Sequence, residues 1–202
     1  LTTNMELIFA SSNAHKAEEL ALLFKGSGLN ITSASESISV TETADNLYGN
    51  AEIKAQAYFQ KYKRPTVADD SGLFVEALPD ELGVLTARFG GDQLTPLQRC
   101  ELLIKRLENE TNRSAFFMCV LCFILSPTET FFFEGRLSGF IGKQIIGDQG
   151  FGYDPIFYPN DLKEGPLGAR SLAQDVEYKM GHSHRARASQ RARSFLASYI
   201  AR

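Results

Sequence analysis

The feature that most constrains the fold is a pair of apolar runs joined by a short turn. Residues 115–125 and 130–136 are rich in Phe, Val, Ile and Leu, and Pro127 lies between them. Such residues favour strands, and a proline-containing turn between two strand-like runs predicts an antiparallel hairpin. Residues 137–146 are expected to continue as a further strand. Because helical and strand-like segments alternate elsewhere, we expect the α/β class, with a mixed sheet flanked by helices.

A strand, a polar loop and a helix are expected in turn near the N-terminus. The apolar run at residues 6–10 ends in Ser11, Ser12 and Asn13, and an amphipathic stretch comes next. Ser12 or Asn13 can cap this helix, whose first N–H groups favour an anion, and Lys16 adds a positive charge in the first turn. A phosphate would fit there. Simple capping beside a solvated lysine explains the same residues equally well.

Two adjacent carboxylates follow a β-prone segment. Asp69 and Asp70 are succeeded by Ser71 and Gly72, a sequence typical of acids at the end of a strand that enters a turn. Adjacent strand residues point to opposite faces, so the two acids are expected to have different roles. An ordinary structural turn is the alternative.

A third acid lies in an expected loop. Residues 31–40 alternate weakly, as an edge strand does, and residues 47–61 carry the apolar stripe of a helix. Glu42 lies between them, where a solvated glutamate is the ordinary case. Only a partner acid nearby in space would make it a ligand.

The second half of the chain holds a capping box, a glycine-rich loop and a basic segment. Thr95 with Gln98 makes a capping box for a helix. Residues 147–156 carry glycines and two aromatic side chains that could flank a base, but Asp154 and its following proline stand where a dinucleotide-binding helix would begin. The polar segment 179–185 is expected to open the last helix. That helix is expected to turn Arg187, Arg191 and Arg193 to solvent and Ala188, Ala192, Phe195, Leu196 and Tyr199 inward.

Charge and cysteine content exclude several classes of protein. The 21 Lys and Arg against 24 Asp and Glu give a net charge of −3. The protein as a whole therefore does not attract nucleic acid or anionic membranes electrostatically. The longest apolar run, 115–125, is far shorter than the roughly 20 residues of a membrane-spanning helix.

Three cysteines argue against a disulfide framework and favour a cytoplasmic setting. Cys119 and Cys122 are spaced like half of a metal site, but packing is expected inside a strand. Ser71 lacks the Gly-x-Ser-x-Gly elbow of a serine hydrolase.

Taken together, these residues suit a nucleoside triphosphate. Acids hold a hard cation through oxygen, lysines balance phosphate charge, and aromatic faces read a base. The same residues fall, in order, into motifs that span residues 9–185, and in these the chain resembles the non-canonical purine NTP pyrophosphatases, the inosine/xanthosine triphosphate pyrophosphatase family. The motifs are Ser11-Ser-Asn-Ala-His-Lys16, Asn50-Ala51 with Lys54-Ala55, Ala68-Asp-Asp-Ser-Gly-Leu73, Thr86-Ala-Arg-Phe89, Phe151-Gly-Tyr-Asp-Pro-Ile156 and Ser183-His-Arg185.

The resemblance implies a fold and an activity. It implies an elongated α/β fold whose two lobes enclose the nucleotide, a homodimer, and hydrolysis of ITP, dITP or XTP to the monophosphate and pyrophosphate with Mg²⁺. Such an enzyme would cleanse the nucleotide pool. We expect one domain over residues 1–202, no membrane or nucleic-acid partner, and residues 1–4, which precede Met5, to be additional to the natural chain.

The resemblance also implies residue roles. Glu42 and Asp70 serve the metal, and Asp70 is the proton acceptor. Since one carboxylate can hardly do both tasks on the same oxygen, we hypothesise that Asp70 orients the attacking water and that Asp69 is the supporting or alternative base. The positions that match substrate contacts are Ser11, Ser12, Asn13, Ala14, His15, Lys16, Ser71, Phe151, Gly152, Tyr153, Asp154, Lys179, His184 and Arg185.

Some positions depart from the family pattern. Ser12 stands where glycine is usual, His15 where a small residue or lysine is common, and Gly49 where many members carry glutamate. These departures leave the loop geometry and the number of metal ligands open. Base choice is expected to rest on the 6-oxo edge, read by residues 151–154 with His184 and Arg185, and on a site that cannot satisfy the 2-amino group of guanine. A nucleotide-binding protein that senses or sequesters without turnover is the alternative function.

Overall fold

A computed structural model describes residues 4–162 and 169–200. Of the residues expected to be additional to the natural chain, 1–3 lie outside this range. No helix in the described part of the chain has the length and apolarity needed to cross a membrane. The elements in chain order are β1 (Met5–Phe9), α1 (Ala14–Phe24), β2 (Leu29–Ser33), α2 (Leu47–Tyr62), β3 (Thr66–Val75), the 3₁₀ helix η1 (Gly83–Arg88), α3 (Pro96–Arg106), β4 (Ser114–Ser126), β5 (Glu129–Ile141), η2 (Asp154–Ile156), β6 (Phe157–Pro159), η3 (Asn160–Leu162), η4 (Leu172–Gln174), α4 (Val176–His182) and α5 (His184–Ile200).

The described strands form one six-stranded sheet in the order β2-β1-β3-β4-β5-β6. β1 is parallel to both β2 and β3, whereas β5 is antiparallel to β6. β4 and β5 are neighbours joined by residues 127–128, and so short a connection joins only antiparallel strands. The predicted hairpin and the mixed α/β sheet are therefore confirmed. That two lobes enclose a nucleotide, and that the chain is one domain, stay predictions.

The chain divides into two compact units, each assembled from separate segments. Unit 1 takes its described residues from 1–71, 119–135 and 184–202, and unit 2 from 72–118 and 136–183. The boundaries fall inside β3, β4 and β5, so each of these strands contributes residues to both units.

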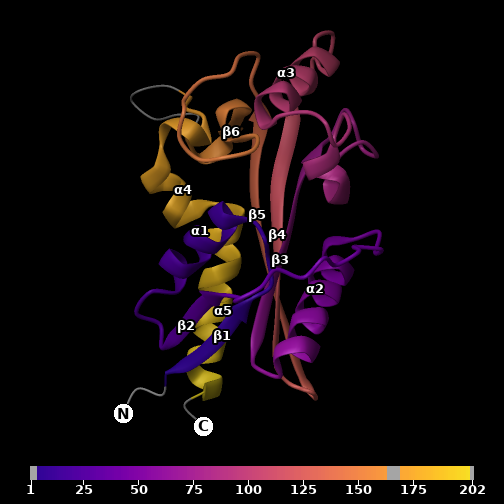
Figure 1. The fold of residues 1–202 in the computed structure, drawn as a ribbon. Helices are drawn as coiled ribbons and strands as arrows, with labels where there is room; N and C mark the ends of the chain where they lie inside the picture. Colours follow the sequence, from indigo (N-terminus) through magenta and orange to yellow (C-terminus); the bar gives the residue numbers. More distant parts are fainter. Residues whose placement is uncertain (1–3, 163–168, 201–202) are drawn as a thin grey trace. The chain divides into compact units, whose positions relative to one another are not determined.

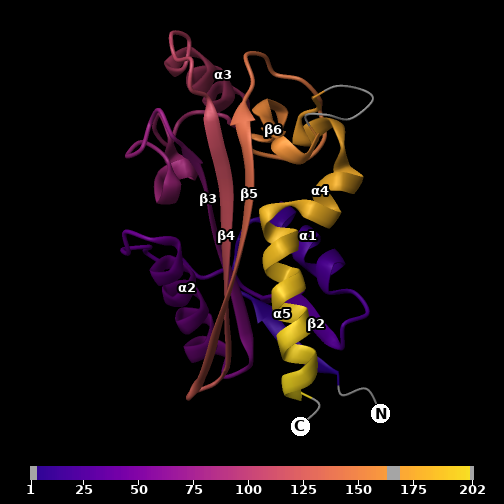
Figure 2. The same ribbon diagram turned by 180° about the vertical axis from the view of Figure 1, so that it is seen from behind.

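Unit 1 has helices on both faces of its strands. α1 and α5 lie side by side on one face and α2 lies on the other, as Figure 1 and the view from behind in Figure 2 both show. Apolar side chains from β1, α1, β4 and α5 pack into its core, including Leu7, Phe9, Leu20, Phe123 and Leu196. Apolar side chains thus pack between the strands of this unit and the helices α1 and α5.

Unit 2 has a core of its own. Its buried side chains come from β3, α3, β4 and the segments after β5, among them Leu73, Leu103, Phe117, Ile156 and Leu172. The predicted capping box starts α3: the Thr95 hydroxyl accepts from the Gln98 N–H at 3.2 Å, and the Gln98 side chain accepts from the Thr95 N–H at 2.8 Å.

Two of the predicted strands have different bounds. The edge strand expected at residues 31–40 is β2, at Leu29–Ser33, and it is indeed the edge of the sheet. Residues 137–146 do not form a separate strand, because β5 runs unbroken from Glu129 to Ile141. Gly135 lies within this strand, and a Cβ there would lie 2.0 Å from the carbonyl oxygen of His184, so that glycine permits close packing against α5.

The expected end of β3 is also wrong. The strand continues through Ser71 and Gly72 to Val75, so the two acids lie in its middle. Gly72 serves close packing here, because a Cβ at this position would lie 2.3 Å from the carbonyl oxygen of Gly83. The Ser-Gly pair therefore marks a backbone approach within an extended strand.

The last predicted helix is two helices. α4 ends at His182, and Ser183, whose ψ of 165° is extended, separates it from α5. Lys179 and Arg185 consequently belong to different helices. The inward side predicted for α5 is confirmed for Ala188, Ala192 and Leu196, whereas Phe195 is 43% exposed.

We predict that Gly72→Ala lowers the free energy of unfolding by about 1–3 kcal/mol, because the added methyl group meets backbone that cannot swing aside. Gly181→Ala in α4 is the matched control: a Cβ there meets no atom within 4 Å, and alanine favours helix. Urea unfolding of both variants measures the difference. Equal midpoints would show that the Gly72 contact relaxes freely.

Candidate active site

Asp69 is the centre of a buried network in unit 1. One carboxylate oxygen accepts a hydrogen bond from the Lys16 ammonium of α1. The other accepts from Arg185 Nε at 2.9 Å and from the Cys119 thiol at 3.1 Å. Arg185 extends the network, since its other nitrogens donate to Glu19 at 2.6 Å and to the Ser71 hydroxyl at 3.2 Å. The side chains of Asp69 and Arg185 are 0% and 1% exposed, so water does not weaken this ion pair.

The alternation of β3 separates the two acids. Asp69 and Ser71 both contact Arg185 of α5, on the face that α1 and α5 cover. Asp70 points the other way and accepts from Lys54 of α2 at 3.0 Å. The expected opposite orientation of the acids is therefore present, because the strand does not turn at this point.

Lys54 joins Asp70 to the third acid. Its ammonium lies 3.0 Å from Asp70 and 3.1 Å from a carboxylate oxygen of Glu42. Glu42 thus has the partner acid that would make it more than a solvated side chain. The second oxygen of Asp70 is buried and has no hydrogen-bond partner among the described residues.

The two acids differ in electrostatic state. Burial by itself would raise the pKa of Asp69, but the charges of Arg185, Lys16 and Lys54 outweigh it and hold that pKa well below its usual range. For Asp70, burial is the largest effect and raises the pKa despite the nearby Lys54 ammonium. Burial opposes the charge of Lys54 as well, yet Asp70, Asp69 and Glu42 together raise its pKa. The like charge of Glu42 raises the pKa of Asp70 further.

The start of α1 is open to solvent. Asn13 is the N-cap, and its side chain accepts from the Lys16 N–H at 3.2 Å, which decides between Ser12 and Asn13 as the capping residue. Ser12, Asn13, Ala14 and His15 are exposed, and Ser11 accepts from the Asn13 N–H at 3.1 Å. An anion can therefore reach the helix N-terminus, beside an ammonium already held by Asp69.

The acids fit a metal that the substrate helps to bind. Among the residues described, no group of three or more His, Cys, Asp or Glu could hold a metal ion. Mg²⁺ usually takes only one or two carboxylates from the protein and completes its shell with water and phosphate oxygens. Asp70 and Glu42, whose carboxylates lie 3.0 Å and 3.1 Å from the same Lys54 ammonium, supply that number of hard oxygen ligands.

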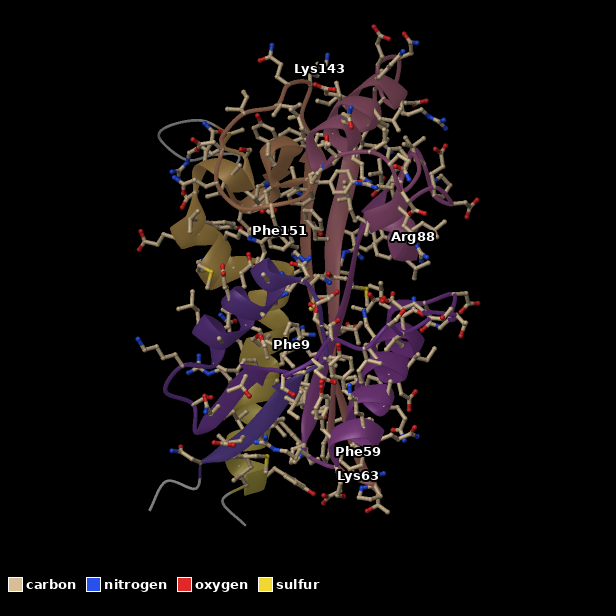
Figure 3. The ribbon with its side chains drawn as sticks, viewed as in Figure 1. Phe9, Phe59, Lys63, Arg88, Lys143 and Phe151 are labelled. Atoms are coloured by element: carbon tan, nitrogen blue, oxygen red, sulfur yellow. The ribbon has the colours of Figure 1, made fainter. Side chains whose placement is uncertain are left out.

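Unit 2 holds a second polar cluster. The Asp154 carboxylate accepts from Lys179 of α4 at 2.7 Å and from the Phe151 N–H at 2.8 Å. The Lys179 ammonium also lies 4.3 Å from the centre of the Phe151 ring, which Figure 3 labels. Asp154 and Lys179 are both 3% exposed. This arrangement fixes an only partly buried aromatic ring in the loop after β5.

Glycine lets this loop close on its own carboxylate. Gly150 has φ +75°, and a Cβ there would lie 2.2 Å from an Asp154 carboxylate oxygen. Gly152 presents its carbonyl to the Cys100 thiol at 3.4 Å. Tyr153 is turned inward, and its hydroxyl donates to the Thr86 carbonyl at 2.8 Å.

The sequence relationships agree with this chemistry. A sequence model of the Ham1 family matches residues 7–195. The chain belongs to the Ham1 family. A dITP/XTP pyrophosphatase of Leptospira interrogans is 36% identical over 197 residues, which cover 95% of this chain and 96% of that protein. Another dITP/XTP pyrophosphatase, from Flavobacterium psychrophilum, is 37% identical over 190 residues, which cover 92% of this chain and 96% of that protein.

Solved Ham1 structures share the fold. The Staphylococcus aureus Ham1 protein has a TM-score of 0.82 at 33% identity, with 96% of this chain and 99% of that one covered. A HAM1 protein of Coxiella burnetii has a TM-score of 0.83 at 30% identity and the same coverage. The family resemblance read from the ordered motifs is therefore confirmed.

In this Ham1-family chain the predicted site residues form two groups. Unit 1 contains residues 11–16, Glu42, Asp69, Asp70, Ser71 and the buried pair His184 and Arg185, and unit 2 contains residues 151–154 and Lys179. Three contributors were given no role from sequence: Lys54, Glu19 and Cys119. Lys54 lies within a family motif and Glu19 lies one helical turn after Lys16, but nothing in the sequence marked Cys119 as a partner of Asp69.

Asp69→Asn and Asp70→Asn should change stability in opposite directions at pH 7 in metal-free buffer. Removing the Asp69 charge leaves Arg185 and Lys16 without their buried counter-charge and should lower the free energy of unfolding by about 3–5 kcal/mol. Asp70→Asn removes a charge that burial disfavours and should raise it slightly.

Urea unfolding measures both variants, and its pH dependence gives a second test. Because the pKa of Asp69 is lowered by folding, its contribution is present above the pKa of an unfolded aspartate and is lost as pH falls through the folded-state value. The wild-type protein should therefore lose stability in acid more steeply than Asp69→Asn. If the wild-type protein and Asp69→Asn lost the same free energy of unfolding in acid, the result would contradict the lowered pKa of Asp69.

Proposed function

We propose that this chain hydrolyses non-canonical purine nucleoside triphosphates, namely dITP, XTP and ITP, to the monophosphate and pyrophosphate. The observation that carries the proposal is the asymmetric acid pair of β3, in which Asp69 is neutralised by Lys16 and Arg185 while Asp70 keeps a buried oxygen without a partner. Relatives at 36–37% identity bear the name dITP/XTP pyrophosphatase, which supports the same reaction class.

The reaction needs a base and a stabilised leaving group. The oxygen of a water molecule bonds to the α-phosphorus, the bond from that phosphorus to the bridging oxygen breaks, and pyrophosphate leaves. The attacking water must lose a proton to a nearby base. We assign Lys16 and the N–H groups that begin α1 to the phosphate oxygens, because a helix N-terminus beside an ammonium favours an anion.

Asp70 is our proposed proton acceptor. Its raised pKa makes it a stronger base than an ordinary aspartate, and its second oxygen has no hydrogen bond that proton uptake would break. Asp69 suits this task poorly, because three donors hold its carboxylate and its pKa is low. We therefore keep Asp69 in the supporting role and no longer favour it as an alternative base.

Asp70 and Glu42 are the proposed ligands of Mg²⁺. When bound with substrate, the ion would balance charge on the phosphates and on the leaving pyrophosphate. Lys54 now spans the same two carboxylates and keeps both charges compensated within the protein itself.

The unit 2 cluster is our proposed reader of the base. The Phe151 ring offers an aromatic face, and the buried Asp154–Lys179 pair holds it in place. Buried polar groups of this kind discriminate strongly, because a mismatched base edge leaves one of them without a hydrogen bond. The expected homodimer and cytoplasmic setting stay predictions, and no observation favours a sensor without turnover.

The purified chain should release pyrophosphate from dITP, XTP and ITP when Mg²⁺ is present, much faster than from ATP or GTP, and EDTA should abolish the release. A coupled pyrophosphate assay with a parallel orthophosphate assay measures this. Orthophosphate as the first product would instead indicate a phosphohydrolase. Tight nucleotide binding without either product would favour the sensor.

The base assignment is tested in the same assay. Asp70→Asn should lower kcat on the order of 10²-fold or more, within the range for loss of a general base. Lys61→Gln is the control and should leave kcat unchanged. Lys61 lies on the same helix as Lys54, and the substitution removes only its exposed ion pair with Glu36. Wild-type turnover by Asp70→Asn would show that another group accepts the proton.

GTP should be a poor substrate even though it shares the 6-oxo group. Its 2-amino group must be buried without a partner, which costs about 1–3 kcal/mol and should lower kcat/KM by on the order of 10- to 100-fold relative to ITP. Steady-state kinetics with both nucleotides checks this. Comparable values would show that the site admits the amino group.

A further inference from the structure

Thr86 of η1 makes an unusual set of buried hydrogen bonds in unit 2. Its hydroxyl oxygen accepts from the Leu73 N–H at 2.9 Å. Its single hydroxyl proton has two carbonyl acceptors in reach, Gly83 at 2.6 Å and Leu73 at 3.2 Å. One side chain thus lies within hydrogen-bond distance of both backbone groups of a residue in β3, a place that a neighbouring strand normally takes.

The position of Leu73 in β3 explains why it needs such a partner. The Ala10 N–H donates to the Val67 carbonyl at 2.8 Å, and the pairing with β1 reaches no further along β3 than Val67. Backbone groups of alternate strand residues point to the same edge, so those of Leu73, six residues on, face the edge that β1 has left. Thr86 continues that edge with a side chain.

The backbone of Thr86 is in turn tied to the proposed base-reading loop. Its carbonyl accepts from the Tyr153 hydroxyl at 2.8 Å, and both residues are buried. Burial raises the pKa of Tyr153, so its hydroxyl remains a donor throughout the physiological range. Only one residue separates Tyr153 from Phe151, and Asp154 follows it directly.

We propose that Thr86 and Tyr153 are a pair of positioning residues that couple the base-reading loop to the segment of β3 immediately after Ser71. The proposal rests on the proposed function, because the loop must read a base for its position to matter. Tyr153 then acts through the loop and does not read the base with its hydroxyl, since that hydroxyl is already engaged with Thr86.

Removing either half of the pair should weaken base discrimination more than turnover. Tyr153→Phe and Thr86→Val each delete hydrogen-bonding hydroxyl groups at nearly constant volume. Each should raise KM for dITP about 2- to 10-fold with a smaller change in kcat, and should narrow the ratio of kcat/KM for dITP over GTP by a similar factor. A loop that is held less firmly admits the 2-amino group more easily.

Two further variants control for general damage. Thr86→Ser keeps the hydroxyl and should retain the wild-type ratio within about 2-fold, the low end expected for one hydrogen bond. Tyr178→Phe also removes a hydroxyl in unit 2, one that donates to Asp161 at 3.0 Å, and should leave the ratio unchanged. Urea unfolding of all variants shows whether they remain folded.

Amide hydrogen exchange of Leu73, followed by NMR, tests the coupling without substrate. Tyr153→Phe should speed exchange of the Leu73 amide about 2- to 10-fold although the substituted group does not touch it, and Tyr178→Phe should not. Unchanged Leu73 exchange in Tyr153→Phe overturns the proposal, as does an equal fall in kcat/KM for dITP and GTP. A wild-type chain that releases no pyrophosphate overturns the proposed function instead, and the exchange result alone then decides the coupling.

Discussion

The buried ion pair between Asp69 and Arg185 holds together segments 116 residues apart in the sequence. Desolvating two charges is costly, and the pair is stable only because further hydrogen bonds satisfy both groups. The Arg185 guanidinium donates to Asp69 and Ser71 of β3 and to Glu19 of α1. Lys16 neutralises the second oxygen of Asp69. A lysine at position 185 could not make this planar, three-way contact. One carboxylate of β3 therefore bonds to side chains of both α1 and α5.

The neighbouring acid lies outside this network. Asp69 pairs with Lys16 of α1 and Arg185 of α5, whereas Asp70 on the other face pairs with the Lys54 ammonium, which it shares with Glu42. Two residues of identical type, joined by one peptide bond, thus have pKa values shifted in opposite directions. The difference comes from which helices face each side of the strand.

Local patterns in the sequence predicted the hairpin of β4 and β5, the capping box of α3, the span of α2 and the opposite faces of Asp69 and Asp70. Each of these depends on residues close in sequence. One error arose where a contact with another segment decides: Gly72 looked like a turn but allows the Gly83 backbone to approach. Lys54 as a bridge and Cys119 as a donor were missed for the same reason, because their partners become neighbours only through folding.

Both acids lie inside β3 with no turn between them. The face to which each side chain points therefore depends on how many strand residues precede it. A substitution at either position alters one environment, but inserting or deleting a single residue upstream within β3 would move every following side chain to the opposite face. Asp69 would then face Lys54, and Asp70 would face α1 and α5. A change in the length of this strand would therefore exchange the environments of both acids at once.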